Sequence, residues 1–120
     1  MMSIISKALL VTVASALYIT SAAAYTGEIT YYNTENGYGA CGTQLSDSGY
    51  TAALSSDVYD NGAYCGQSIQ IEWQGNTVTA TVEDLCPGCD STSVDLTPTA
   101  FEALAPTSVG VLSGATWNFV

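Results

Sequence analysis

Basic side chains are almost absent from this sequence. Lys7 is the only Lys or Arg among the 120 residues, and there is no His, whereas all 11 Asp and Glu residues follow Ala24. A chain with carboxylates and no cation from residue 25 onward repels phosphate backbones and anionic lipid headgroups. Nucleic acid and membrane surfaces are therefore not expected as partners, and polyanionic polysaccharides are disfavoured. Neutral glycans and cationic partners remain open.

The sequence also lacks an apolar run long enough to form a membrane span. The run from Ala8 to Ile19 is shorter than the roughly 20 residues that a spanning helix needs. It follows Lys7 and precedes small residues that end at Ala24, an order typical of a secretory signal peptide. We therefore predict a signal peptide over residues 1–24, an extracellular location, and one small monomeric domain over residues 25–120.

The cysteine pattern is that of an exported protein. Four cysteines follow the predicted signal peptide, at Cys41, Cys65, Cys86 and Cys89. An even number in a small secreted domain predicts two disulfides, and three pairings are possible. A zinc site is disfavoured because there is only one C-x-x-C pair and no His. We expect no metal and no cofactor.

Alternation of polar and apolar residues predicts short strands and few helices. The predicted order begins with a strand at Tyr25–Tyr32, a loop over Asn33–Gly49 and a short helical turn capped by Ser55. A hairpin of Ser68–Trp73 and Thr77–Asp84 follows. The chain then continues with a helix capped by Thr97, with Pro98 at its first position, and ends with one or two closing strands in Gly110–Val120. This order favours a mainly β fold and a small barrel. Periodicity does not give the topology of that barrel.

Two carboxylates stand out as candidate catalytic residues. Continued alternation from Val82 predicts that Asp84 faces inward at the end of a buried row, and Asp95 lies just before the predicted helix. A poorly solvated Asp needs a specific reason to be there. With Thr30, the pair would form the floor of a carbohydrate-binding groove. The structural alternatives are a cap for the CPGC turn at Asp84 and a helix-dipole contact at Asp95.

Aromatic residues supply further candidates for sugar binding. Tyr32, Tyr38 and Tyr64 lie near glycine-rich loops and are predicted to contact substrate, whereas Trp73 and Trp117 have the parity of core residues.

Six blocks in one order carry a resemblance to a known family. They are GEITYY, GACG, AALSSDVYDNG, CGQSIQI, TATVEDLCPGC and VDLTPTAFEALA. Together they resemble expansin-like proteins of the single-domain fungal type, including loosenins and rare-lipoprotein-A-like or barwin-like proteins. The resemblance implies a six-stranded double-psi β-barrel with one or two short helices and disulfide bonds. It also implies a groove that binds cell-wall polysaccharide such as cellulose or chitin and loosens it without hydrolysis.

The resemblance also implies roles for single positions of this sequence. Thr30 matches the family's groove threonine, Asp84 its first aspartate and Asp95 the second, on which loosening depends most. The place of a groove tyrosine in bacterial members is taken by Cys86, and Asn33 stands where related family-45 endoglucanases carry a general-base Asp. For the cysteines, the resemblance implies a Cys41–Cys65 pair and leaves Cys86 with Cys89.

These positions favour slippage of glycan contacts over cleavage. Inverting hydrolysis needs both an acid and a base, and Asn33 cannot take a proton from water. Asp84 remains a possible base, so a weak endoglucanase stays open. A second alternative is a papain-type cysteine-protease inhibitor on the same barrel, a role that would not need Asp95.

Overall fold

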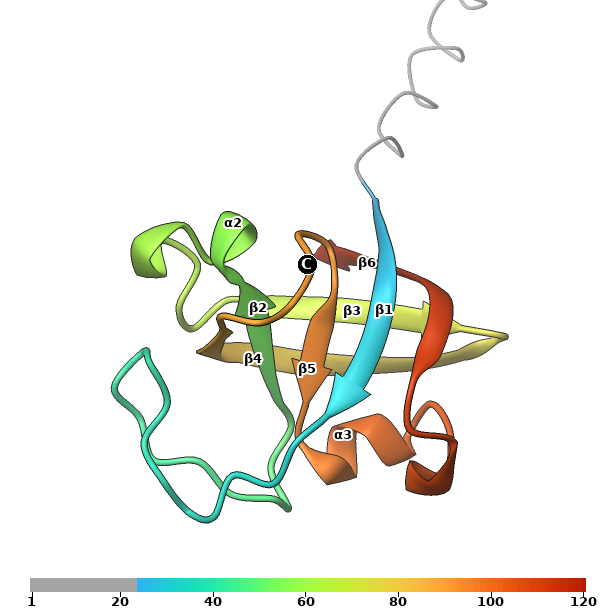
Figure 1. Ribbon diagram of the computed structural model, residues 1–120, viewed down its shortest axis with the longest axis horizontal. Coiled ribbons are helices and arrows are strands. Elements are labelled where there is room, and N and C mark those ends of the chain that lie inside the picture. Colours follow the sequence, from blue (N-terminus) through green and yellow to red (C-terminus); the bar gives the residue numbers. More distant parts are fainter. Residues whose placement is uncertain (1–23) are drawn as a thin grey trace, which may run out of the picture.

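Residues 24–120, which the computed structural model describes, form a closed barrel of six strands in the order β1-β5-β2-β4-β3-β6 (Figure 1). The elements along the chain are β1 (Tyr25–Tyr31), β2 (Thr51–Ser55), α2 (Ser56–Tyr59), η2 (Asp60–Gly62), β3 (Ser68–Trp73), β4 (Asn76–Cys86), β5 (Val94–Leu96), α3 (Pro98–Glu102), η3 (Thr107–Val109) and β6 (Leu112–Phe119). The predicted six-stranded, mainly β barrel with short helices is confirmed.

The barrel is mixed in strand direction. β1 pairs in parallel with β5, and β2 pairs in parallel with β4, whereas the other four pairings are antiparallel. Parallel pairing requires a crossover between the strands. The crossovers place β5 and β2, which are far apart in the sequence, side by side between β1 and β4. The strands that carry Thr30, Asp95 and Asp84 therefore lie close together in the barrel wall.

One apolar core fills the barrel. It contains the inward residues of all six strands and the buried face of α3, namely Ile29, Ala52, Leu54, Ile69, Ile71, Val78, Ala80, Val82, Val94, Leu96, Ala100, Phe101, Leu104, Ala105, Leu112, Ala115 and Trp117. Phe101 from α3 packs against the Tyr31 ring, with ring centroids 4.9 Å apart. These contacts hold α3 against the end of β1.

The β3–β4 hairpin agrees with its prediction. Ile69 pairs with Ala80 and Ile71 with Val78, so the apolar residues of both strands share the inner face. The turn places Gln74 and Gly75 at positive φ (47° and 87°). Two consecutive left-handed residues are what a two-residue hairpin turn requires, and glycine adopts this backbone without strain.

Two strands were not predicted. β2 lies in the segment expected to lead into a helical turn, and β5 lies where a helix entry was expected. All five residues of β2 are buried, so its sequence shows no polar–apolar alternation. β5 has only three residues, too few for a periodic signal. Both strands depend on their barrel neighbours rather than on their own sequence pattern.

Both predicted helix caps lie at helix starts. Ser55 is the N-cap of α2, and its hydroxyl oxygen accepts from the Val58 N–H. Thr97 is the N-cap of α3 in backbone conformation, with Pro98 at the first turn, but its side chain makes no capping hydrogen bond. Its hydroxyl donates instead to the Gly49 carbonyl, which ties the loop to α3.

The predicted inward orientation of Asp84 is wrong. Ala52 pairs with Val82, but the next residue, Ala53, pairs with Asp84, so Glu83 is an extra residue in β4. A bulge of this kind changes which face the following side chain points to. Asp84 therefore turns away from the core that Val82 enters.

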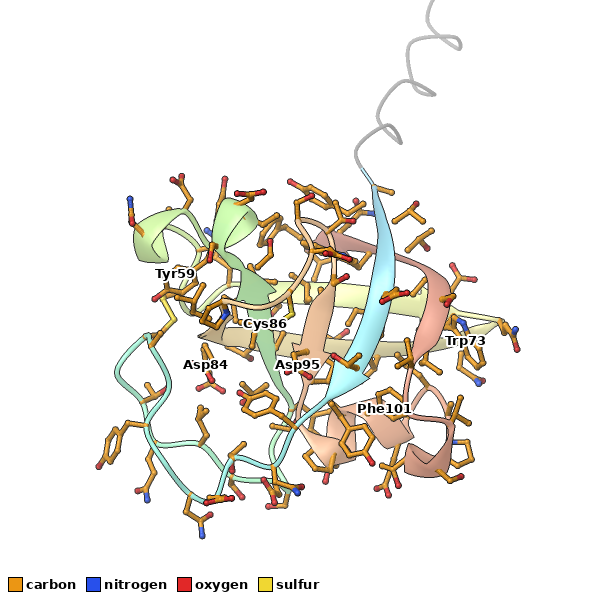
Figure 2. All side chains as sticks on the ribbon, in the orientation of Figure 1. Tyr59, Trp73, Asp84, Cys86, Asp95 and Phe101 are labelled. Carbon is orange, nitrogen blue, oxygen red and sulfur yellow. A yellow bond between two sulfur atoms is a disulfide. The ribbon has the colours of Figure 1, made fainter. Side chains whose placement is uncertain are left out.

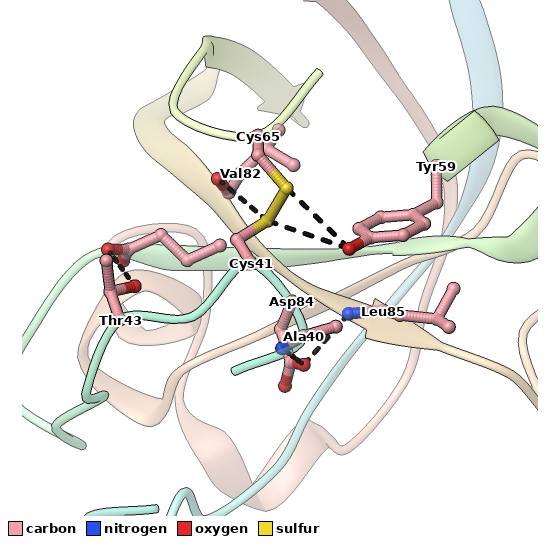
Figure 3. Close-up of a disulfide and its surroundings, with 9 residues drawn as sticks. Ala40, Cys41, Thr43, Tyr59, Cys65, Val82, Asp84 and Leu85 are labelled. Carbon is pink, nitrogen blue, oxygen red and sulfur yellow. Dashed lines mark hydrogen bonds between the residues drawn. A yellow bond between two sulfur atoms is a disulfide. The ribbon is translucent and has the colours of Figure 1, made fainter. Parts of the chain in front are cut away.

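The cysteines form the two disulfides that the resemblance implied, Cys41–Cys65 and Cys86–Cys89. Figure 3 shows the first beside Tyr59, whose hydroxyl lies 3.6 Å from the Cys65 sulfur.

The predicted signal peptide falls almost wholly outside the described residues. No helix within residues 24–120 has the length and apolar character needed to traverse a bilayer.

The two disulfides should differ in their contribution to stability. Cys41–Cys65 closes a loop with a sequence separation of 24, and Cys86–Cys89 one of only 3. Because loop-closure entropy grows with loop length, replacing the first pair by Ser should cost about 3 kcal/mol and replacing the second about 2 kcal/mol. Urea unfolding of the two double variants measures both. An equal or larger loss for the short loop would contradict this ranking.

Candidate functional site

Four residues form a transverse row on the outer face of the barrel. Thr30 pairs with Asp95, Asp95 with Ala53, and Ala53 with Asp84, across β1, β5, β2 and β4. Residues directly opposite one another on paired strands share a face. Val94 and Leu96 on either side of Asp95 are fully buried in the core, so Asp95 and its row partners point outward. Figure 2 labels the two carboxylates, Asp84 on β4 and Asp95 on β5.

Asp95 is a partly buried carboxyl with one side-chain partner. The Thr30 hydroxyl donates to its Oδ1 at 2.9 Å. Burial raises the pKa of Asp95 above its ordinary value, and the nearby charge of Asp84 adds to this, while the Thr30 hydrogen bond opposes it. Asp95 therefore retains a proton at higher pH than an exposed aspartate does. It is suited to donate a proton or a hydrogen bond to a ligand oxygen.

Asp84 is held by three donors. Its Oδ1 accepts from the Ala40 N–H at 2.8 Å and the Leu85 N–H at 2.9 Å, and its Oδ2 accepts from the Tyr32 hydroxyl at 2.8 Å (Figure 3 shows the two backbone contacts). A carboxylate has about four lone-pair sites, so most of them are occupied. Asp84 accepts two backbone N–H bonds, but the donors are Ala40 in the loop and Leu85, and neither lies in the CPGC turn that the cap alternative named.

Tyr32 connects the end of β1 to Asp84. Burial, the hydrogen bond to Asp84 and the negative charges of Asp84, Asp95 and Glu83 all raise the pKa of the Tyr32 phenol. Its hydroxyl therefore stays protonated and remains a donor. Glu83 accepts hydrogen bonds from the Thr51 and Thr43 hydroxyls, so β4 is tied to both β2 and the loop.

The other two predicted tyrosines are not brought to the carboxylates. Tyr38 lies in the loop, 74% exposed, where it forms an isolated bridge with Gln44. Tyr64 stacks on Phe119 with ring centroids 4.6 Å apart. It lines a separate hollow of about 360 Å³ whose walls also include Tyr25, Asp57, Val58, Asp60, Ser91 and Thr92. A groove role for Tyr64 is therefore not supported.

A hollow at Thr30 is lined by residues outside the predicted set. Thr30 lines a hollow of about 230 Å³, with walls that also include Glu28, Cys86, Gly88, Cys89, Asp90 and Ser93. The Cys86–Cys89 disulfide thus forms one wall next to the transverse row. Only the CPGC pattern pointed to this turn, and nothing in the pattern indicated a wall. No group of three or more potential metal ligands occurs within residues 24–120.

Both tryptophans have structural roles, as predicted. Trp117 is 1% exposed, and its ring N–H donates to the Thr92 carbonyl at 3.0 Å. Trp73 packs against the core, and its ring N–H donates to the Ser113 carbonyl at 3.0 Å.

Topology and site together define the class of protein. The closed barrel with two parallel strand pairs is a double-psi β-barrel, and the chain belongs to the double-psi β-barrel family whose model, described as lytic transglycolase, matches residues 24–115. Among its relatives, the chain is 40% identical over 102 residues to the papain inhibitor of Streptomyces mobaraensis, over 79% of this chain and 71% of that protein. It is 32% identical over 123 residues to an EG45-like domain containing protein of Citrus jambhiri, over 91% of this chain and 93% of that protein.

Solved structures show the same two kinds of relative. The Streptomyces papain inhibitor superimposes with a TM-score of 0.73 at 38% identity, over 82% of this chain and 96% of that one. A mutant expansin of Clavibacter michiganensis, solved in complex with cellohexaose, gives a TM-score of 0.74 at 26% identity, over 82% of this chain and 50% of that one. The chain therefore spans about half of the expansin. The expected expansin-like family is confirmed.

Asp95 should lower the stability of the fold at neutral pH. Its pKa is higher in the folded than in the unfolded chain, where it lies near 3.9, so ionisation favours unfolding as pH rises above about 4. Asp95→Asn should therefore be more stable than wild type at pH 7, and the difference should vanish near pH 3. Thermal unfolding between pH 3 and 8 measures it.

Asp47 provides a control of opposite sign. The Thr34 N–H and hydroxyl both donate to its Oδ1, and these hydrogen bonds hold the pKa of Asp47 below its ordinary value. Its contribution to stability is present above about pH 4 and is lost as pH falls. Asp47→Asn should therefore be less stable than wild type at pH 7 and equal at low pH. The same sign for both variants would contradict these assignments.

Asp84 should control the order of the loop at Ala40. Asp84→Ala removes the acceptor of three donors, and we expect a loss of about 2 kcal/mol in the free energy of unfolding. Amide hydrogen exchange at Ala40 should accelerate in this variant. Tyr32→Phe removes only one of the three bonds and should leave that exchange close to wild type. Unchanged exchange at Ala40 in Asp84→Ala would refute the anchoring role.

Proposed function

We propose that this protein is a secreted, expansin-like protein that binds neutral cell-wall polysaccharide, such as cellulose or chitin, and loosens it without hydrolysis. One observation carries the proposal. Thr30, Asp95 and Asp84 stand in register on the outer face, and Thr30, whose hydroxyl donates to the partly buried Asp95, lines an open hollow. A proton-retaining carboxyl there can compete for hydrogen bonds between glycan chains without breaking a covalent bond.

The surroundings of Asp84 argue against a hydrolytic role. Asp95 and Asp84 lie two strands apart, about 9–10 Å between Cα atoms at ordinary strand spacing. Besides an acid, inverting hydrolysis needs a base that can activate water. The Asp84 oxygens already accept from Ala40, Leu85 and Tyr32. Asn33 carries an amide, so neither residue is well suited to be that base.

Charge defines which glycans suit this groove. There is no Lys, Arg or His after Lys7, so an anionic polysaccharide would meet carboxylates without counterions. A neutral chain presents hydroxyl groups, which can hydrogen-bond to Thr30 and Asp95. The chain spans about half of the expansin to which it is similar.

A second candidate function is cysteine-protease inhibition. The papain inhibitor of Streptomyces mobaraensis is 40% identical, and the solved Streptomyces inhibitor is matched over 96% of its length. The loop that contains Tyr38 offers an exposed protein-binding surface on the same barrel. Such contacts would depend on the loop and not on the proton of Asp95.

Glycan loosening should depend on Asp95. We expect Asp95→Asn to reduce the mechanical strength of cellulose or chitin at least about tenfold less than wild type does, because the variant loses one strong hydrogen bond to the glycan. The assay measures the mechanical strength of cellulose or chitin strips and retention of the protein on cellulose, chitin, chitosan and xylan. Glu102→Gln, which neutralises an exposed acid on α3, is the matched control and should behave as wild type.

The same proteins distinguish the alternatives. Papain inhibition that persists in Asp95→Asn, with no loosening by wild type, would replace the glycan proposal by the inhibitor. Release of reducing ends from soluble glucan would establish a hydrolase and overturn the non-hydrolytic mechanism.

A further inference from the structure

Ala53 occupies an unusual position in the transverse row. Its neighbours Ala52 and Leu54 lie in the core cluster, so Ala53 points to the outer face, between Asp95 and Asp84. Its side chain is nevertheless only 2% exposed. Part of the chain on the outer face must therefore cover it.

The Tyr32 side chain reaches from the end of β1 to β4. The backbone N–H of Tyr32 donates to the Leu96 carbonyl at 3.0 Å, which fixes the Tyr32 backbone beside β5. Its hydroxyl reaches Asp84 on β4 at 2.8 Å. β5 and β2 lie between β1 and β4 in the barrel, so a side chain that reaches from the end of β1 to Asp84 spans the width of both strands. Ala53 is the outward residue of β2 that pairs with both carboxylates.

We propose that Ala53 is a specificity-determining residue. Its methyl group is small enough for the Tyr32 ring to lie above it, across the barrel, and this ring forms the floor of the groove. The inference rests on the proposed function in one respect: this floor is the platform for a sugar ring. A tyrosine ring has an apolar face and a polar tip. It therefore suits an unbranched neutral glycan whose ring faces lie flat, with Thr30 and Asp95 at its edge.

A larger side chain at position 53 should disturb this floor. β2 is buried on both faces, so added atoms cannot turn into solvent. They would lift the Tyr32 ring into the groove or separate its hydroxyl from Asp84. Either displacement narrows the space for a glycan and exposes the phenol to water.

The test compares Ala53→Val, Ala53→Ser and Ala53→Gly. Affinity for cellohexaose is measured by calorimetry, and ionisation of Tyr32 is followed by NMR of ring-labelled tyrosine, with Tyr32→Phe for assignment. Ala53→Val should bind about tenfold more weakly than wild type, and Tyr32 should ionise at lower pH. Ala53→Ser should change both quantities in the same direction by less, and Ala53→Gly should bind within about twofold of wild type.

Thr79→Val is the matched control, because Thr79 is exposed on the opposite, solvated stretch of β4 and pairs with Gln70. A folded Ala53→Val with unchanged affinity and unchanged Tyr32 ionisation would overturn the proposal. If Ala53→Val does not fold, Ala53→Ser decides on the same two measurements. If wild type binds neither cellohexaose nor a chitin oligosaccharide, the proposed function is wrong. The position of Tyr32 over Ala53 is then supported by a shifted Tyr32 ionisation in Ala53→Val and refuted by an unshifted one.

Discussion

The register shift between β2 and β4 is the constraint on which the site depends. With regular alternation, Asp84 would follow Val82 into the core, where an unpaired carboxylate is too costly to keep ionised. The extra residue at Glu83 turns Asp84 outward and places it opposite Ala53. There it accepts from the loop through Ala40 and from β1 through Tyr32. One bulge thus completes the transverse row and fixes the loop beside it.

The partly buried carboxyl of Asp95 lowers the stability of the fold at neutral pH. Burial raises the pKa of Asp95, so its ionised form is less favourable in the folded chain than in the unfolded chain. The Thr30 hydrogen bond offsets part of this cost. A purely structural residue at this position could be a neutral amide without such a cost. The disulfide between Cys41 and Cys65, together with a core that extends through all six strands, gives the fold the stability to tolerate it.

The sequence predicted those parts of the fold that have a local pattern. The β3–β4 hairpin follows from alternation and a glycine turn, Trp117 from strand parity, and the start of α3 from Thr97 and Pro98. β2 and β5 were not predicted, because one is buried on both faces and the other has three residues. The bulge at Glu83 has no local signal, so the predicted facing of Asp84 was wrong, and the same bulge puts Asp84 in register with Ala53 and Asp95. Tyr64 lines a different hollow from Thr30, and proximity to a glycine-rich loop does not indicate which hollow a ring will line.

The two candidate functions use neighbouring parts of one structure. Asp84 binds the loop through Oδ1 and the proposed groove floor through Oδ2. The exposed part of that loop, around Tyr38, makes its contacts within the loop, through Gln44 and backbone bonds. Substitutions in the exposed loop can therefore change what a protein partner meets without moving the carboxylates of the row. Changes at Asp84 would affect both surfaces together. The same barrel can therefore occur in glycan-binding and in protein-binding relatives. Asp84 holds both the loop and Tyr32, while the surfaces that would contact a glycan or a protein are separate.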